Sequence, residues 1–146
     1  MVPPGAPAWG KIYALANSPA NCVDLAGSIA PDGEAILAYP CHNADNQQWS
    51  YEISTNTLLS GYVTNRPLCI DVGGDHVSNG SQVQIWTCNG TGAQVWRITG
   101  QSLYNPQSGR CLDAPSGQVA QLRIWDCNFG GNANQNWDIV GYNGTL

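Results

Sequence analysis

The sequence predicts an all-β fold built from three copies of one unit, and three observations lead to this expectation. The tripeptide Gln-x-Trp occurs three times, ending at Trp49, Trp96 and Trp137. Six cysteines precede these motifs as three spaced pairs. The apolar runs are short and bounded by Gly, Asn, Pro or Ser, and no stretch shows helical periodicity with caps. Because repeats of this length stack against one another, we expect a closed threefold arrangement.

Length and composition fit a single turn-rich domain. The chain has 146 residues, including 17 Gly and 9 Pro. Charged residues make up 10% of the sequence, against an average of about 25% for globular proteins. We expect a linker-like tail over residues 1–9 and one domain over 10–146, with repeats at about 10–57, 58–99 and 100–142.

The charge pattern excludes two classes of partner. Nucleic acids and anionic membranes require clustered Lys and Arg, whereas this chain has five scattered basic residues and a net charge of −5. A helix that inserts into a membrane needs about 18 or more apolar residues, and no such run is present in the sequence. The start, MVPPGAPAWG, lacks the basic and apolar regions of a signal peptide and is typical of a linker.

Each repeat carries three short strand signals. The Gln-x-Trp tryptophans are spaced 47 and 41 residues apart (96−49 and 137−96), and a unit of that size cannot bury its apolar side alone. A closed fold also removes exposed sheet edges. The expected strands are IYAL, AILAY and WSYEI in the first repeat, YVT, VQIW and WRI in the second, and SLY, LRIW and WDIV in the third.

The repeat also assigns the cysteines. An even number of cysteines in a chain of low charge indicates disulfides and secretion. A bridge that closes a loop of this size stabilises by roughly 3 kcal/mol. Zinc is the alternative, but C-x-x-C pairs are absent and His42 and His76 fit no ligand spacing, so we expect no metal. The expected pairs are Cys22–Cys41, Cys69–Cys88 and Cys111–Cys127.

Alternation along the strands separates two kinds of aromatic residue. In SQVQIWTC, Val83 and Ile85 point to one face and Trp86 to the other. Trp125 follows the same pattern, and Tyr39 follows it more weakly. We therefore expect Trp86 and Trp125 to form exposed platforms, although burial in a secondary contact is the alternative because Trp is usually largely buried. The Gln-x-Trp tryptophans instead share a core face with downstream apolar residues. These sets are Trp49 with Tyr51 and Ile53, Trp96 with Ile98, and Trp137 with Ile139.

The ordered set Cys-x-Asp, Gly-rich turn, strand, aromatic-x-Cys and Gln-x-Trp recurs three times between Gly10 and Ile139. This set resembles the ricin B-chain type lectins, a group that includes the carbohydrate-binding modules of family 13. The resemblance implies a β-trefoil fold of twelve short strands with pseudo-threefold symmetry. It also implies up to three sugar sites, one per repeat, which we name the α, β and γ sites.

The resemblance assigns to each site an Asp, an aromatic residue and the Asn-Gln that opens Asn-Gln-x-Trp; the β site lacks this Asn and has Gln84 as a substitute. An exposed ring stacks on the C–H face of a sugar, an Asp accepts hydrogen bonds from adjacent hydroxyls, and an amide both donates and accepts. The alternative for each Asp is a turn or capping residue. The α site has Asp24, Tyr39, Asn46 and Gln47; the β site has Asp71, Gln84, Trp86 and Gln94; the γ site has Asp113, Trp125, Asn134 and Gln135.

Two departures from the pattern affect the order in which we expect the sites to work. Ala93 replaces the Asn before Gln94, which removes a sugar donor from the β site unless Gln84 substitutes for it. In the γ site the Asp-to-Cys spacing is 14 (127−113) instead of 17, and Arg123 stands where Gln84 stands in the β site. These departures rank the α site first, the γ site next and the β site last.

The expected function is non-catalytic carbohydrate binding by a secreted protein without a cofactor. Galactose-type ligands are expected first, and xylan or arabinose-containing chains second. The chain is either a stand-alone lectin or the accessory module of a secreted glycoside hydrolase, covalently linked to a catalytic domain. A glycosidase needs two carboxylates about 5–10 Å apart, and no such pair recurs between the repeats. A trefoil protease inhibitor or protein-binding module is the other alternative.

Overall fold

The structure is a computed structural model that describes residues 9–15, 21–27, 30–62, 66–115, 119–129, 131 and 133–139. Within these ranges the chain forms thirteen β-strands and single-turn 3-10 helices. None of the helices in the described ranges has the length and apolar character needed to cross a membrane. The tail expected over residues 1–9 lies, apart from Trp9, outside the described residues.

The elements recur in the same order in each repeat. The first repeat contains β1 (Ile12–Ala14), β2 (Asn21–Leu25), β3 (Ile36–Pro40), η1 (Asp45–Gln47) and β4 (Trp49–Glu52). The second contains β5 (Thr57–Ser60), β6 (Leu68–Val72), η2 (Gly73–Asp75), β7 (Val83–Thr87), η3 (Gly92–Gln94) and β8 (Arg97–Thr99). The third contains β9 (Ser102–Asn105), β10 (Arg110–Asp113), β11 (Ala120–Gln121), β12 (Arg123–Asp126), η5 (Ala133–Gln135) and β13 (Trp137–Ile139).

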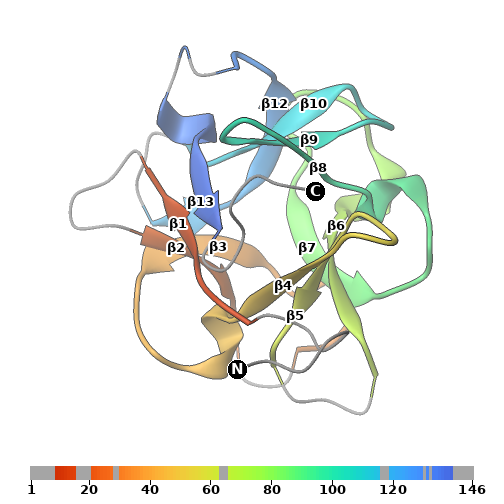
Figure 1. Cartoon of the computed structure of the whole chain (residues 1–146). Helices are drawn as coiled ribbons and strands as arrows, with labels where there is room; N and C mark the ends of the chain where they lie inside the picture. The colour runs from red at the N-terminus through yellow and green to blue at the C-terminus, as the bar shows by residue number, and fades with distance from the viewer. Residues whose placement is uncertain are drawn as a thin grey trace.

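Three antiparallel sheets surround a common centre (Figure 1). Their strand orders are β11-β3-β2-β1-β13, β4-β5-β6-β7 and β12-β10-β9-β8. Each sheet takes its strands from two repeats. The last strand of a repeat pairs with the first strand of the next, and β13 closes the ring by pairing with β1. The closed threefold arrangement expected from the repeats is therefore confirmed.

One strand of each repeat contacts the other two repeats near the pseudo-threefold axis. The equivalent cross-repeat pairs are Ala35 with Gln84, Gln82 with Arg123, and Gln121 with Leu37. The strand of the third repeat changes partner at Leu122, since β11 pairs with β3 and β12 pairs with β10. This change of partner divides one of the twelve expected strands into two, which gives thirteen.

The Gln-x-Trp tryptophans form the shared core, as the alternation predicts. Trp49 and Trp96 are fully buried, and Trp137 is nearly so. A buried indole needs a hydrogen-bond partner. Each indole N–H donates to the carbonyl oxygen of the residue after the first cysteine of its repeat, at 2.9 to 3.1 Å. Ile53, expected in this core, is instead 58% exposed because β4 ends at Glu52 and the chain turns there.

The three expected disulfides are all present. Cys22–Cys41, Cys69–Cys88 and Cys111–Cys127 have Cα separations of 5.0, 5.1 and 5.1 Å. Each bridge ties the second strand of its repeat to the loop that follows the third strand. The residue after the second cysteine is held by a hydrogen bond from its backbone N–H to the Gln of the Gln-x-Trp motif.

Candidate functional site

The site aspartates are buried in all three sites. Asp24, Asp71 and Asp113 lie toward the ends of β2, β6 and β10 and are 4%, 5% and 1% exposed. A buried carboxylate is stable only with hydrogen-bond donors. The Gln of each Gln-x-Trp motif supplies one, through Nε2 at 2.8, 3.0 and 3.0 Å.

These glutamines lie behind the carboxylates. Gln47, Gln94 and Gln135 are at most 1% exposed. In each, Nε2 also donates to the carbonyl oxygen of the residue before the second cysteine, and Oε1 accepts from the backbone N–H of the residue after it. Both N–H groups of each glutamine amide and one acceptor position on its oxygen are therefore used within the protein. The geometry gives these amides a positioning role: they fix the Asp relative to the disulfide loop.

The platform aromatics lie on the outer face, as their alternation predicts. Tyr39, Trp86 and Trp125 are 43%, 38% and 39% exposed. Each lies directly across the strand pair from the first cysteine of its repeat. The residue two positions earlier in the same strand lies directly across from the site Asp. Directly opposite residues in an antiparallel pair interact most strongly, so this second position controls the carboxylate.

The residue opposite the Asp differs in the three repeats. It is Leu37 in the α site, Gln84 in the β site and Arg123 in the γ site. Gln84 Nε2 donates to Asp71 Oδ1 at 3.0 Å, and Arg123 Nε donates to Asp113 Oδ1 at 2.9 Å. Leu37 has no donor, and Asp24 Oδ1 accepts no hydrogen bond from the part of the chain that the structure describes.

The γ site is filled by its own side chains. Asp113 accepts from Arg123 and Gln135, and also from Asn134 Nδ2 at 2.8 Å. These three bonds use three of the roughly four acceptor positions of a carboxylate. The Arg123 guanidinium carbon lies 4.4 Å from the centroid of the Trp125 ring, so the cation covers a face of the platform. The γ residues come together as expected, but they engage one another.

The α site is partly filled. His42 follows the second cysteine, and its Nε2 lies 3.4 Å from Asp24 Oδ2. The imidazole makes an edge contact with the Tyr39 ring, with centroids 6.5 Å apart. Asn46 Nδ2 donates to the Leu25 carbonyl oxygen at 3.1 Å. The α platform and acid are present, and one imidazole contacts both.

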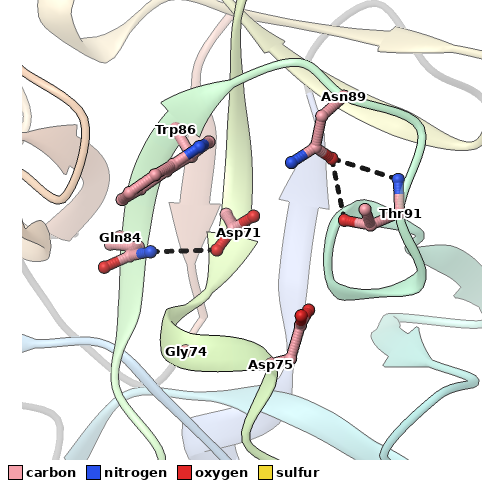
Figure 2. Close-up of a pocket in the computed structure, with 7 residues that line it drawn as sticks. All are labelled: Asp71, Gly74, Asp75, Gln84, Trp86, Asn89 and Thr91. Atoms are coloured by element: carbon pink, nitrogen blue, oxygen red, sulfur yellow. Dashed lines mark hydrogen bonds between the residues drawn. The ribbon is translucent and has the colours of Figure 1, made fainter.

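The β site is an open notch of about 200 Å³. Figure 2 shows the Trp86 ring above Asp71, with Asp75 and Asn89 on the opposite side. Asn89 Oδ1 accepts from the backbone N–H and hydroxyl of Thr91 at 3.1 and 2.8 Å, which directs its Nδ2 toward the notch. Ala93, which replaces the expected Asn, is buried and leaves the notch unobstructed.

Sequence reasoning missed Asp75, Asn89 and Thr91, which all line the notch. One signal was available, because Asn89 directly follows the second cysteine, as His42 and Asn128 do in the other repeats. Asp75 gave no such signal. It lies in the single-turn η2 with φ of 56°, a conformation that the spacing of the sequence does not predict.

The notch is acidic. Burial raises the pKa of Asp71, and hydrogen bonds from Gln94 and Gln84 only partly offset that effect. The nearby carboxylates of Asp75 and Asp32 raise this pKa further. The described residues contain no group of three or more His, Cys, Asp or Glu side chains able to hold a metal ion.

Comparison with known proteins identifies relatives that match most of this chain. The model of the ricin-type beta-trefoil lectin domain matches residues 8–141. Nigrin b of Sambucus nigra is 27% identical over 122 residues, which cover 82% of this chain and 20% of nigrin b. The chain spans 13% to 20% of the length of the curated relatives that it matches.

Two solved structures share the architecture. The designed threefold symmetric protein ThreeFoil superposes with a TM-score of 0.76 at 23% identity, over 92% of this chain and 99% of ThreeFoil. The C-terminal half of an earthworm R-type lectin, in complex with GalNAc, superposes with a TM-score of 0.73 at 18% identity. That superposition covers 91% of this chain and 98% of the earthworm chain.

Proposed function

The chain belongs to the ricin-type beta-trefoil lectin family, and from this premise we propose that it binds carbohydrate without catalysing a reaction. We assign the principal site to the β notch, a second site to the α position, and no binding to the γ position as it stands. The observation that carries this proposal is the exposed Trp86 ring beside Asp71, with open space between them and Asn89.

The free hydrogen-bonding capacity of the β notch suits a sugar. Asp71 has roughly four acceptor positions and uses two of them, one per oxygen, for Gln84 and Gln94. One position on each oxygen remains for two adjacent hydroxyl groups, and charge assistance strengthens such bonds. Asn89 Nδ2 adds a donor on the opposite side. The Trp86 ring supplies an apolar surface for the C–H face of the sugar.

The expected ligands are galactosides, including GalNAc derivatives. A galactose-type sugar has one apolar face and hydroxyls along its rim, which matches a ring on one side and an acid with an amide on the other. The GalNAc-bound earthworm lectin with the same fold supports this choice. Xylan and arabinose-containing chains are the second class. Their pentoses offer a smaller C–H face to Trp86, so we expect weaker binding.

The α and γ positions differ in what must move before a sugar enters. In the α site the His42 imidazole contacts both the platform and the acid. Its displacement breaks the 3.4 Å contact with Asp24, the edge contact with Tyr39 and the 3.1 Å hydrogen bond from the Ala44 backbone N–H. In the γ site a sugar would have to displace Arg123 from both Asp113 and Trp125. The β site requires no displacement, so we rank it first instead of last, while the α site stays ahead of the γ site.

We further propose that the protein acts outside the cell as a module joined to a catalytic domain. Three disulfides in the described residues favour an oxidising compartment. The chain spans only a fifth of nigrin b, so its family also occurs as one part of longer proteins. In this setting the β and α sites act together on a branched or polymeric glycan and gain by effective concentration.

Titration of galactosides and xylo-oligosaccharides into the wild type, Trp86→Ala and Trp125→Ala tests the proposal. The two tryptophans are equally exposed and occupy equivalent positions, so Trp125→Ala is a matched control. We expect Trp86→Ala to weaken binding at least tenfold and Trp125→Ala to leave it unchanged. Equal affinity of all three proteins would disprove the β assignment. Stronger binding of xylo-oligosaccharides would replace the galactoside assignment.

A further inference from the structure

A second hollow adjoins the β notch at the junction of the three repeats. It has a volume of about 590 Å³, compared with about 200 Å³ for the notch. Small-molecule sites usually measure about 300–1,000 Å³, so the notch alone is small and the hollow lies within the usual range. Gly74 and Gln84 line both spaces, so the two lie side by side.

We propose that the ligand of the β site is an oligosaccharide, whose first sugar occupies the notch and whose next sugar occupies this hollow. The inference rests on the proposed function and names its substrate class: a neutral glycan of at least two units. The first sugar stacks on Trp86, and the second is held by hydrogen bonds from side chains of more than one repeat.

Gln84 connects the two spaces through the two ends of its amide. Its Nε2 donates to Asp71 Oδ1 at 3.0 Å, which belongs to the notch. Its Oε1 lies 3.2 Å from the position that a Cβ on Gly73 would take and 3.9 Å from that on Gly33. Figure 2 shows this oxygen on the side of the amide away from Asp71. The oxygen therefore faces the hollow and accepts no hydrogen bond from a described residue.

Two glycines lie at the boundary between the two spaces. A Cβ on Gly33, in the first repeat, would lie 3.9 Å from both Gln84 Oε1 and the Trp86 ring edge. The φ of Gly33 is 95°, which disfavours other residues at this position. A Cβ on Gly73 would come within 3.2 Å of both Gln84 Oε1 and the Gln82 carbonyl oxygen. A side chain at Gly33 would therefore narrow the space between ring and amide, and one at Gly73 would crowd the Gln84 amide.

The lining of the hollow suits hydroxyl groups. Gln82 and Gln121 contribute amides, and Glu34 contributes a carboxylate. Gln82 is exposed, and Gln121 Nε2 donates to the Val83 carbonyl oxygen at 3.1 Å, which fixes its orientation. Asp71 and Asp75 line the notch, and Glu34 lines the hollow together with His76. Uronic and sialic acids should be rejected because like charges repel.

The pseudo-symmetry supplies a variant that fills the hollow. Ala35 lines it and occupies the position that Gln82 and Gln121 occupy in the other repeats. Two of the three repeats already fold with Gln there, so Ala35→Gln should fold. Its longer side chain enters the hollow without entering the notch. Glu34→Gln is the companion variant, which removes the charge and retains the size.

The test uses isothermal titration in a Tyr39→Ala background, which removes the α platform and leaves the β site. The probes are methyl galactoside, lactose, raffinose and sialyllactose, with xylose and xylotriose as the pentose pair. We expect at least one neutral oligosaccharide to bind roughly three- to tenfold more tightly than its monosaccharide, which is the effect of about one added hydrogen bond. Ala35→Gln should abolish that difference and leave monosaccharide binding unchanged.

The outcomes separate the two proposals. Binding of monosaccharides without any gain for longer neutral chains overturns the extended site and leaves the proposed function intact. A gain that persists in both Ala35→Gln and Glu34→Gln also overturns it. Sialyllactose binding as tightly as lactose contradicts this charge repulsion, and Glu34→Gln should improve sialyllactose binding if the repulsion is correct. Absence of all saccharide binding in the Tyr39→Ala background overturns both the β assignment and the extended site.

Discussion

Exchange of the residues opposite the site aspartates should exchange the binding capacity of the β and γ sites. Gln84→Arg places a guanidinium where Arg123 lies in the third repeat. By symmetry it should bond Asp71 as Arg123 bonds Asp113, at 2.9 Å, and cover Trp86 as Arg123 covers Trp125, at 4.4 Å. The β notch would then be closed by its own side chain.

The magnitude follows from the two contacts that a sugar must replace. A cation over an aromatic ring stabilises by about 0.5–2 kcal/mol. A hydrogen bond to a charged group contributes about 1.5–3 kcal/mol, part of which the sugar hydroxyl recovers when it replaces the arginine. A net cost of about 2 kcal/mol corresponds to a roughly thirtyfold loss of affinity. We therefore expect Gln84→Arg to weaken galactoside binding at the β site about thirtyfold.

The reciprocal variant should open the γ site. Arg123→Gln uncovers Trp125 and supplies an amide donor to Asp113, as Gln84 does for Asp71. The expected result is galactoside binding in a protein that also carries Trp86→Ala and Tyr39→Ala, which remove the other two platforms. The partial cover of Asp113 by Asn134 should keep this new site weaker than the β site.

Isothermal titration measures affinity and stoichiometry, and thermal denaturation checks that each variant folds. Wild-type affinity in Gln84→Arg would refute the reasoning, because the residue opposite the acid would then not control entry. A γ site that stays silent in folded Arg123→Gln would show that loop length, and not the arginine, closes it.

Three further predictions concern stability and pH. Gln94→Ala should lower the free energy of unfolding by about 2–4 kcal/mol, measured in urea, because it removes one of the two hydrogen bonds to the buried Asp71 and the side-chain hydrogen bonds to two backbone groups. The double variant Cys69→Ala with Cys88→Ala should lose about 3 kcal/mol, and added reductant should then have no effect at this bridge. Galactoside affinity should fall on acidification, because protonation of Asp71 removes acceptors. The fall should begin above pH 3.8, because burial raises the pKa of Asp71. Because this pKa is higher in the folded than in the unfolded protein, the Asp71 carboxyl contributes stability that is present below pH 3.8 and is lost as the pH rises through the folded pKa. Asp71→Asn should flatten the pH dependence of both affinity and stability.

The architecture could be predicted from the sequence because it depends on repeated patterns. The three Gln-x-Trp motifs and the cysteine spacing predict three repeats and their disulfides, and both are confirmed. The alternation in β7 correctly places Val83 and Ile85 in the core and Trp86 outside. Such period-two patterns report burial directly, since the faces of a strand alternate strictly.

The interior of the sites was harder to predict because it depends on cross-strand register. The resemblance assigns Gln94 to the sugar, whereas the structure buries it behind Asp71. The difference between Leu37, Gln84 and Arg123 is visible in the sequence. Its meaning appears only when each residue is seen directly opposite its Asp.

The pairing of β1 with β13 has a consequence for how the chain is made. Ile12 is the register partner of Ile139, so the seam joins the two ends of the described chain. During synthesis the first repeat must wait for the last strand before its sheet is complete. A ribosome-bound chain that lacks β13 exposes an unpaired strand edge, which is a template for aggregation. The ends of the seam are also neighbours in space, so a short peptide joining them should permit new termini to be cut in a loop elsewhere in the ring.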